Sequence, residues 1–363
     1  MTDRSVCHLK KNQLLSLASY RDQLRQSPKL LWVFFELTNA CNLLCAHCGS
    51  RCSAGGNRLS ATDISNVLKT LPDQNPMVCL TGGEPLLHPD FFHIARTVAD
   101  LGFSWGMTSN GTLIDQQAAR RLRETKMGTV SISLDGLEET HDRLRRQKGA
   151  WKKAVAGIRN LQDAGFSPQV TTVIHADNID ELEKIYRLLC DLGITSWRPI
   201  NVEPIGRACE ADSMLLSAAQ MTRLLNFIQE KRYDSSCPME VTYGCSHYLG
   251  IERERMVRDN YFICGAGIFV ASVRSNGDIC ACLDIENLPD LVQGNIRRDN
   301  FWDVWNQGFK AFRTDRTEKS SICRACEDRR ICGGDSAHTW DWIRNEPLLC
   351  IQRLLAESTD PGD

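Results

Sequence analysis

The stretch Asn39-Ala-Cys-Asn-Leu-Leu-Cys-Ala-His-Cys-Gly49 holds three cysteines, Cys41, Cys45 and Cys48, in the order C-x3-C-x2-C. Iron–sulfur clusters are held by cysteine thiolates, normally four of them. A loop with three thiolates therefore predicts a cluster that keeps one iron open for another ligand. Tetrahedral thiolate sites also suit zinc, but zinc loops usually pair two C-x2-C units, which this spacing fits poorly.

The composition describes a chain with room for one large domain or two. It has 363 residues, 42% of them hydrophobic, and a net charge of −2, so nothing favours nucleic acid or a membrane as a partner. The longest apolar run, Leu30–Phe35, is too short to cross a bilayer, and residues 1–10 lack the apolar stretch of a signal peptide. We therefore expect a cytoplasmic protein whose 17 cysteines bind metal instead of forming disulfides.

Short apolar, β-branched runs alternate with helical patterns through the first two-thirds of the chain, which indicates a parallel sheet covered by helices. The expected strands are Leu31–Leu37, Met77–Thr81, Phe103–Thr108, Thr129–Leu134, Gln169–Ile174 and Ser196–Asn201. The expected helices are Ser60–Leu71, Asp90–Leu101, Asp115–Glu124, Trp151–Ala164, Ile179–Leu192 and Ser217–Lys231. Six such units predict an α/β fold with a partial (β/α)6 barrel, whose chemistry sits at the carboxyl ends of the strands.

Each motif of the chain follows one of these strands. The cysteine loop (residues 39–49) follows the first strand, Gly82-Gly-Glu-Pro85 the second, Ser109-Asn-Gly111 the third and Asp135-Gly136 the fourth. The carboxyl ends of parallel strands share one rim, so these motifs are expected to meet in one site.

The pattern changes near Tyr233, beyond which the chain is rich in Cys, Gly, Arg and Asp. We expect a helical lead-in at 1–27, a core at 28–235, a second domain at 236–355 and a tail at 356–363. The second domain would be held together by metal more than by a large core.

The cysteine loop, with His47 before its last cysteine and Gly82-Gly-Glu-Pro85 thirty-four residues on, resembles the radical S-adenosylmethionine enzymes over residues 28–235. The resemblance implies that Cys41, Cys45 and Cys48 hold a 4Fe–4S cluster and that S-adenosylmethionine chelates its fourth iron. Reductive cleavage of that cofactor then yields a 5′-deoxyadenosyl radical, which abstracts a hydrogen atom from the substrate.

The resemblance also implies which residues bind S-adenosylmethionine. Gly82 and Gly83 would let the backbone approach the ligand, Glu84 would accept hydrogen bonds from the methionyl ammonium, and Pro85 would stiffen the turn. Further candidates are Ser133 for the ribose or carboxylate, Asn110 for the ribose and Arg145 for the methionyl carboxylate. Asp135 is as well explained by a turn as by a ligand.

The C-terminal third resembles the SPASM extension, which binds auxiliary 4Fe–4S clusters, over residues 240–355. One complete cluster would use four cysteines: Cys323, Cys326, Cys332 and Cys350. The other would use Cys264 and Cys282. The family usually has a further cysteine ligand for this cluster, and Ser336 stands at that position here. Cys245 is our preferred substitute and Cys280 the alternative, and an open iron or an absent cluster are further possibilities. A zinc-ribbon-like domain is the competing interpretation.

The remaining cysteines have weaker interpretations. Cys52 would close the first cluster if it were a fourth ligand, so we expect it beside the cluster without ligating it. Cys79 and Cys190 are expected to be buried small hydrophobes. No role is assigned to three others: Cys7, Cys209 and Cys237.

The combined resemblance implies hydrogen abstraction from a peptide or protein side chain, leading to crosslinking, epimerisation or oxidation, as in the maturation of ribosomally made peptides. Expected partners are that substrate and an external one-electron reductant such as flavodoxin or ferredoxin. The alternatives are a sulfatase-maturating formylglycine-forming enzyme, a small-molecule substrate, and a non-catalytic electron-transfer module. Glu203, Tyr243 and Asp284 lie in segments expected near the cavity, without a signal that assigns them a role.

Overall fold

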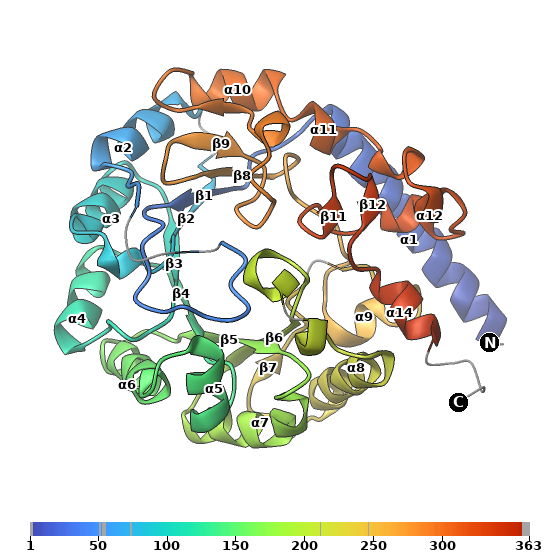
Figure 1. Ribbon diagram of the computed structural model, residues 1–363, viewed down its shortest axis with the longest axis horizontal. Helices are drawn as coiled ribbons and strands as arrows, with labels where there is room; N and C mark the ends of the chain where they lie inside the picture. Colours follow the sequence, from blue (N-terminus) through green and yellow to red (C-terminus); the bar gives the residue numbers. More distant parts are fainter. Residues whose placement is uncertain are drawn as a thin grey trace.

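A computed structural model describes residues 3–50, 52, 56–72, 75–210, 212–245 and 247–357. Its centre is one ten-stranded sheet in the order β10-β9-β8-β1-β2-β3-β4-β5-β6-β7. Neighbouring strands from β1 to β7 pair in parallel. The sheet curls into an incomplete barrel with helices on its outside (Figure 1), so the expected α/β fold is confirmed.

The strands of the described residues are β1 Trp32–Glu36, β2 Met77–Thr81, β3 Trp105–Ser109, β4 Thr129–Ser133, β5 Gln169–Ile174, β6 Ser196–Asn201, β7 Glu240–Val241, β8 Val270–Val273, β9 Asp278–Cys280, β10 Gly294–Asn295, β11 Trp340–Asp341 and β12 Glu346–Pro347. The α-helices are α1 Asp3–Gln26, α2 Ala61–Thr70, α3 Phe91–Asp100, α4 Gln116–Glu124, α5 Glu138–Arg145, α6 Ala150–Asp163, α7 Leu182–Asp191, α8 Ala218–Tyr233, α9 Glu254–Val257, α10 Phe301–Gln307, α11 Lys310–Arg313, α12 Ser321–Arg324, α13 Arg329–Cys332 and α14 Ile351–Glu357. Strands β1–β6 and helices α2, α3, α4, α6, α7 and α8 correspond to the twelve expected elements.

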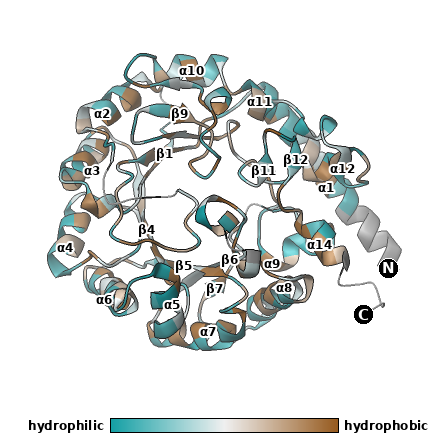
Figure 2. Cartoon of the chain, viewed as in Figure 1, coloured by the Kyte–Doolittle hydropathy of each residue, from teal (hydrophilic) through white to brown (hydrophobic). Residues whose placement is uncertain are grey.

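Local sequence signals explain where several of these helices begin. Ser60 and Asp63 form a reciprocal capping box at the start of α2, because each side chain accepts from the other's backbone N–H at 3.1 and 2.9 Å. Helix α5, which the sequence pattern did not predict, is mostly hydrophilic (Figure 2). Its buried face contains His141 and Arg145, so it lacks the apolar stripe that marks an amphipathic helix.

The C-terminal third continues the barrel sheet. Strand β8 pairs in parallel with β1, aligning Val270 with Trp32, and β9 and β10 follow in antiparallel pairing. The hydrophobic core is likewise continuous, since Phe301 and Trp305 of α10 belong to the same buried cluster as the barrel strands. The C-terminal third therefore shares the hydrophobic core of the barrel, whereas packing held mainly by metal was expected for it.

Helix α1 spans the expected lead-in and lies beside the C-terminal third (Figure 1). The guanidinium of Arg21 donates to the backbone carbonyls of Ile331 and Arg330 at 2.8 and 2.7 Å. The N-terminal helix is thus fixed to α13, which carries Cys332.

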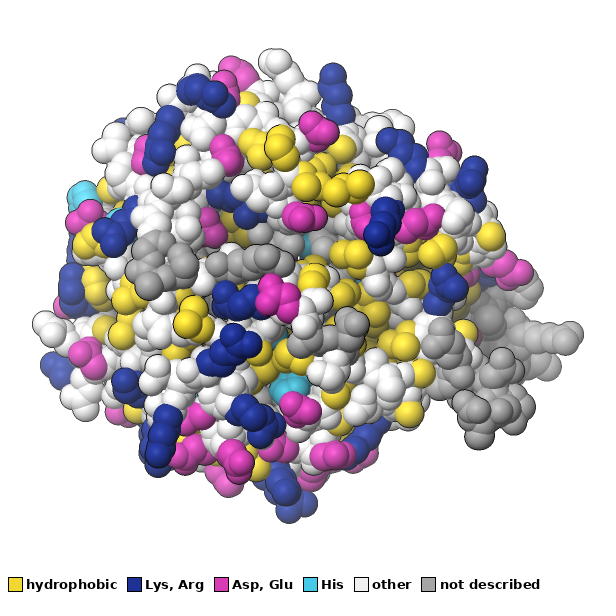
Figure 3. Space-filling view, in the orientation of Figure 1, with side chains coloured by type: hydrophobic (Ala, Val, Ile, Leu, Met, Phe, Trp, Pro, Cys, Tyr) yellow, Lys and Arg dark blue, Asp and Glu magenta, His cyan; other side chains and the backbone are white. Residues whose placement is uncertain are grey.

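The outer surface mixes charges of both signs. On the face drawn in Figure 3, Lys and Arg side chains alternate with Asp and Glu, as the net charge of −2 suggests. In the described part of the chain, no helix has both the length and the apolar character that crossing a membrane requires.

Candidate active site

The cysteine loop leaves the end of β1 and brings its three thiols together. Cys45 is buried, Cys41 and Cys48 are half-buried, and all three pack in one small apolar cluster with Leu43 and Ala150. Burial, together with the neighbouring Cys45 and Cys48 thiols, raises the pKa of Cys41 to about 11. Three converging thiols suit an iron–sulfur cluster, which would supply the positive charge that ionised sulfurs need in this buried place.

Cys52 lies next to this loop, where it was expected. Its thiol hydrogen-bonds to Cys48, and this contact is the largest factor that lowers the pKa of Cys48 to about 5. Cys52 is buried, so its sulfur stabilises the Cys48 thiolate from beside the loop.

The two glycines after β2, Gly82 and Gly83, lie close to the backbone of the residues that follow β1. The N–H of Gly83 donates to Thr38 O at 2.8 Å and that of Glu84 to Ala40 O at 2.9 Å. A Cβ at Gly83 would lie 2.1 Å from Ala40 O, and one at Gly82 would lie 2.5 Å from Thr38 O. Both glycines therefore let the turn lie close to the backbone at Thr38 and Ala40, and their approach to the ligand stays a prediction.

Glu84 ties two strand ends together. Its buried carboxylate accepts from Ser109 Oγ at 2.9 Å, from the Asn110 N–H at 2.8 Å and from the Leu86 N–H at 3.3 Å. Burial raises its pKa to about 7. Its oxygens fix β3 against β2, and Pro85 starts the short 3-10 turn that follows. The contact of Glu84 with the methionyl ammonium stays a prediction.

Asn110 and Ser133 occupy the rim as expected. The Asn110 amide donates to Asn42 Oδ1 at 2.9 Å and accepts from the Thr112 N–H at 2.9 Å. It thereby links the third strand end to the cysteine loop. Ser133, the last residue of β4, is half-buried.

Arg145 forms a buried ion pair with Asp135. Its Nε and Nη2 lie 2.6 and 2.5 Å from Asp135 Oδ2, and its Nη1 donates to Cys45 Sγ at 3.6 Å. Burial opposes ionisation of Asp135, but the guanidinium outweighs it and lowers the pKa to about 2. The guanidinium thus binds the chain's own carboxylate and faces the cysteine loop, and Asp135 is more than a turn former.

Histidines that the sequence analysis did not assign surround this pair. His47 Nε2 lies 3.8 Å from Asp135 Oδ2, and the Asp135 N–H donates to His141 Nδ1 at 3.0 Å. The opposite nitrogens, His47 Nδ1 and His141 Nε2, are buried without a partner among the described residues. Such orphaned polar atoms beside the cysteine loop fit a site that a polar cofactor completes.

The four C-terminal cysteines line one hollow of about 530 Å³, as the sequence analysis expected. They are Cys323, Cys326, Cys332 and Cys350. Burial raises the pKa of Cys350 to about 11, with smaller contributions from Asp335 and from the Cys323 and Cys326 thiols. This donor set fits a four-thiolate cluster.

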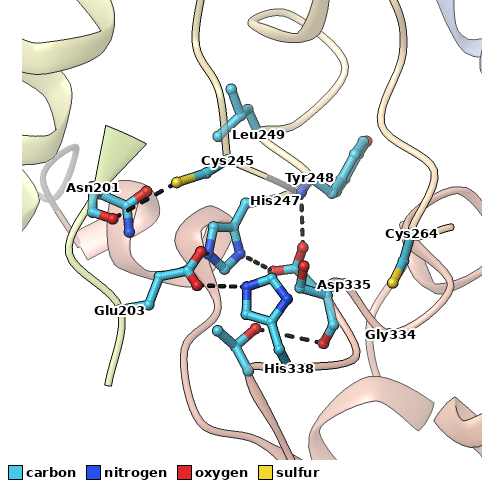
Figure 4. Close-up of polar contacts among 12 residues, drawn as sticks. Asn201, Glu203, Cys245, His247, Tyr248, Leu249, Cys264, Gly334, Asp335 and His338 are labelled. Atoms are coloured by element: carbon cyan, nitrogen blue, oxygen red, sulfur yellow. Dashed lines mark hydrogen bonds and ion pairs between the residues drawn. The ribbon is translucent and has the colours of Figure 1, made fainter. Parts of the chain in front are cut away.

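The other predicted auxiliary site is only partly assembled. Cys264 and Cys282 line the same hollow. Burial raises the pKa of Cys282 well above its ordinary value, and the nearby Asp284 and Cys264 add to the rise. Cys245 lines this hollow as well; its thiol lies 3.7 Å from Asn201 O, and Figure 4 draws it apart from Cys264, so its role as a ligand stays a prediction. Cys280 contacts Arg274, and Ser336 is buried beside Ala337, whose N–H meets Cys264 Sγ at 3.4 Å.

The cysteines expected to lie outside the clusters are dispersed. Cys79 in β2 and Cys190 in α7 are half-buried, so they are less enclosed than expected. Tyr186 Oη lies 3.4 Å from Cys237 Sγ, and Cys209 Sγ lies 2.8 Å from Pro204 O. The side chain of Cys7 lies outside the described residues.

Two adjoining hollows open between the rim and the C-terminal third. One, of about 490 Å³, is lined by residues that include His47, Arg198, Glu203, Cys264, Cys282 and His338. The other, of about 680 Å³, is lined by residues that include Glu36, Ser50, Arg274, Asp284, His338 and Trp340. His338 and Asp284 line both, so they stand where the hollows meet.

A histidine–carboxylate network, His338–Glu203–His247–Asp335, lies where the two hollows meet (Figure 4). Glu203, just beyond the end of β6, meets His338 Nε2 at 2.5 Å and His247 Nε2 at 2.9 Å. His247 Nδ1 lies 3.0 Å from Asp335 Oδ2. Burial opposes the charged form of His338, but Glu203 outweighs it and raises the pKa to about 9.

This network predicts a loss of stability at alkaline pH. The pKa of His338 is higher in the folded chain, about 9, than its ordinary 6.5. The contribution of His338 to the free energy of unfolding is therefore complete below pH 6.5 and is lost as the pH rises through 9. Urea unfolding at pH 6 and pH 9.5 should show the parent losing on the order of 3 kcal/mol more than His338→Gln between the two pH values. Equal losses in both proteins would contradict the assignment.

Comparisons with known proteins agree with this geometry. Residues 35–189 match the radical SAM superfamily, and residues 264–327 match the SPASM iron–sulfur cluster-binding domain. An AdoMet-dependent heme synthase of Methanosarcina barkeri is 31% identical over 350 residues, covering 90% of this chain and 97% of the relative. The mycofactocin maturase MftC of Mycolicibacterium smegmatis is 29% identical over 311 residues, covering 83% and 76%.

A solved structure, Streptococcus suis SuiB bound to its precursor peptide SuiA, has the same fold with a TM-score of 0.70 and 19% identity, covering 85% of this chain and 72% of that one. The two family matches imply S-adenosylmethionine and 4Fe–4S clusters as cofactors, which the converging thiols fit. The chain belongs to the radical SAM superfamily of enzymes, among the members that carry a SPASM iron–sulfur domain.

Proposed function

We propose that this enzyme acts on an iron-containing tetrapyrrole, as its heme synthase relatives do by name. The observation that carries the proposal is the placement of the two hollows. Their walls come from both the barrel rim and the C-terminal third, and the 31% identity to the heme synthase extends over 90% of the chain. The part of the chain that aligns with the heme synthase therefore includes residues from both sides of the two hollows.

Hollows of this size fit a macrocycle with carboxylate side chains. Their volumes, about 490 and 680 Å³, lie in the range of small-molecule sites. Arg198 lines the first and Arg274 the second, so each hollow has a cation for a carboxylate. Arg274 Nε is buried without a partner among the described residues.

The chemistry follows from the difference between Fe-coproporphyrin III and heme, which has vinyl groups where the former has two propionates. Each conversion removes one hydrogen atom, one carbon dioxide and one electron. Bound S-adenosylmethionine, cleaved by an electron from an external reductant such as flavodoxin or ferredoxin, supplies the agent that takes the hydrogen atom. The electron released by the substrate needs an acceptor, and the site lined by Cys323, Cys326, Cys332 and Cys350 is proposed to hold it.

The chain's own residues position these reactants. Glu84 fixes β3 to β2, and Gly83 seats the turn against the cysteine loop. The Asp135–Arg145 pair holds a positive charge next to Cys45. Asn110 and Ser133 on the rim are retained as proposed contacts of the cofactor, and Cys41, Cys45 and Cys48 as proposed ligands of its cluster.

Peptide modification is the second candidate, favoured by the 29% identity to mycofactocin maturase. Under this alternative the same hollows would receive a side chain of a peptide or protein. The relative named a heme synthase covers more of the chain than the maturase, 90% against 83%, so we place the tetrapyrrole first.

The test is substrate-dependent formation of 5′-deoxyadenosine. The anaerobically reconstituted, reduced enzyme is mixed with S-adenosylmethionine and either Fe-coproporphyrin III or a mycofactocin precursor peptide, beside a Cys41/Cys45/Cys48→Ala triple variant. We expect the tetrapyrrole to increase the product at least tenfold and to be converted itself, with no product from the variant. Stimulation by the peptide alone would replace the first candidate by the second.

A further inference from the structure

His338 has one imidazole nitrogen available where the two hollows meet. Its Nε2 is bound to Glu203 at 2.5 Å, and no described residue hydrogen-bonds to its Nδ1. The side chain keeps 14% of its surface exposed and lines both hollows. Glu203 in turn is held from behind by His247, which is anchored on Asp335 (Figure 4).

The Glu203–His338 pair has the arrangement of a metal-binding histidine. Such histidines commonly donate one ring N–H to a carboxylate, which fixes the ring and makes the other nitrogen more basic. The charges nearby favour a metal over an anion, because Glu203 and Asp284 both lie close to the imidazole. A substrate carboxylate would be repelled by the same two groups.

A free metal ion would find too few ligands here. Across the part of the chain that the structure describes, no group of three or more His, Cys, Asp or Glu side chains is arranged as a site for a single metal ion. One available nitrogen suffices, however, for a metal whose other positions are filled by a macrocycle, as haem iron held by one histidine shows.

We propose that His338 Nδ1 binds the iron of the tetrapyrrole substrate at the junction of the two hollows, with Glu203 as the positioning residue behind it. This inference rests on the proposed function. The nitrogen donates an electron pair to iron, any proton on it is released to solvent, and the iron keeps its oxidation state. The bond fixes the plane of the macrocycle and thus the position of its side chains.

The test compares iron and metal-free coproporphyrin III on the reconstituted enzyme without S-adenosylmethionine. Binding is followed by quenching of tryptophan fluorescence, and the iron's ligand by the Soret band and the EPR spectrum. We expect the parent to shift the Soret band of ferric coproporphyrin III to that of an imidazole complex. His338→Ala should abolish the shift and leave the affinity for the metal-free macrocycle within twofold.

Two variants and a rescue separate ligation from general damage. Glu203→Gln should retain the shift with about tenfold weaker binding of the iron form. His93→Ala, an exposed histidine on α3, should behave as the parent, and added imidazole should restore the spectrum of His338→Ala. An unchanged iron spectrum in His338→Ala, with both macrocycles bound, would overturn the iron bond and leave the proposed function intact. If neither macrocycle binds to the parent, the proposed function and this inference both fail.

Discussion

Gly83→Ala is expected to lose the N-terminal cluster and to lower the free energy of unfolding by about 3 kcal/mol. The new Cβ would lie 2.1 Å from Ala40 O and 3.0 Å from Cys41 Cβ. To remove this clash, the backbone of the cysteine loop would have to shift, and the shift would break the Gly83–Thr38 and Glu84–Ala40 hydrogen bonds. Iron per chain after reconstitution and urea unfolding measure the two effects.

Gly128→Ala is the matched control, because its nearest contact would be Trp105 O at an ordinary 3.5 Å. It should bind iron as the parent does and change stability by less than about 1 kcal/mol. Full iron loading in Gly83→Ala would show that the turn and the cysteine loop are not coupled as described.

Arg145→Met is expected to destabilise the fold by about 3–5 kcal/mol, because it leaves the Asp135 carboxylate buried without its partner. The variant also removes the cation that faces Cys45 at 3.6 Å. We therefore expect a lower reduction potential of the N-terminal cluster, since a nearby positive charge stabilises the more negative, reduced form. Denaturant unfolding and potentiometric EPR titration measure the two effects.

Arg143→Met tests whether loss of any arginine on α5 has the same effect. Arg143 is 54% exposed, and its ion pair with the exposed Asp177 is long at 3.9 Å. Its removal should therefore change the free energy of unfolding by about 0.5 kcal/mol or less. Comparable losses in the two variants would argue against a special role for the Asp135–Arg145 pair.

The sequence was sufficient wherever the signal was periodic or closely spaced. The observed bounds of β2, β5 and β6 agree with those predicted, because each is a short segment between two helical patterns. The cysteine loop was recognisable because its three thiols lie within eight residues of each other. Four distant cysteines were also grouped correctly around one hollow, through the family spacing.

The remainder depended on contacts that local sequence does not encode. Glu203 and His338 are 135 residues apart, and neither belongs to a motif, so their pairing appears only when the C-terminal third packs on the rim. The ion pair of Arg145 with Asp135 of the chain itself was likewise not predicted, and the contact of Arg145 with the methionyl carboxylate stays a prediction. Strand β8 has only four residues, Val270–Val273, too few for period-2 alternation to be distinguished from a loop.

We propose that this chain removes hydrogen from a tetrapyrrole side chain held between the rim and the C-terminal third. The most direct measurement follows deuterium from Fe-coproporphyrin III, labelled on its propionate carbons, into 5′-deoxyadenosine by mass spectrometry. We expect one deuterium in the nucleoside for each side chain converted, and none with the Cys41/Cys45/Cys48→Ala variant. Unlabelled 5′-deoxyadenosine from the parent, with the tetrapyrrole recovered unchanged, would contradict the account.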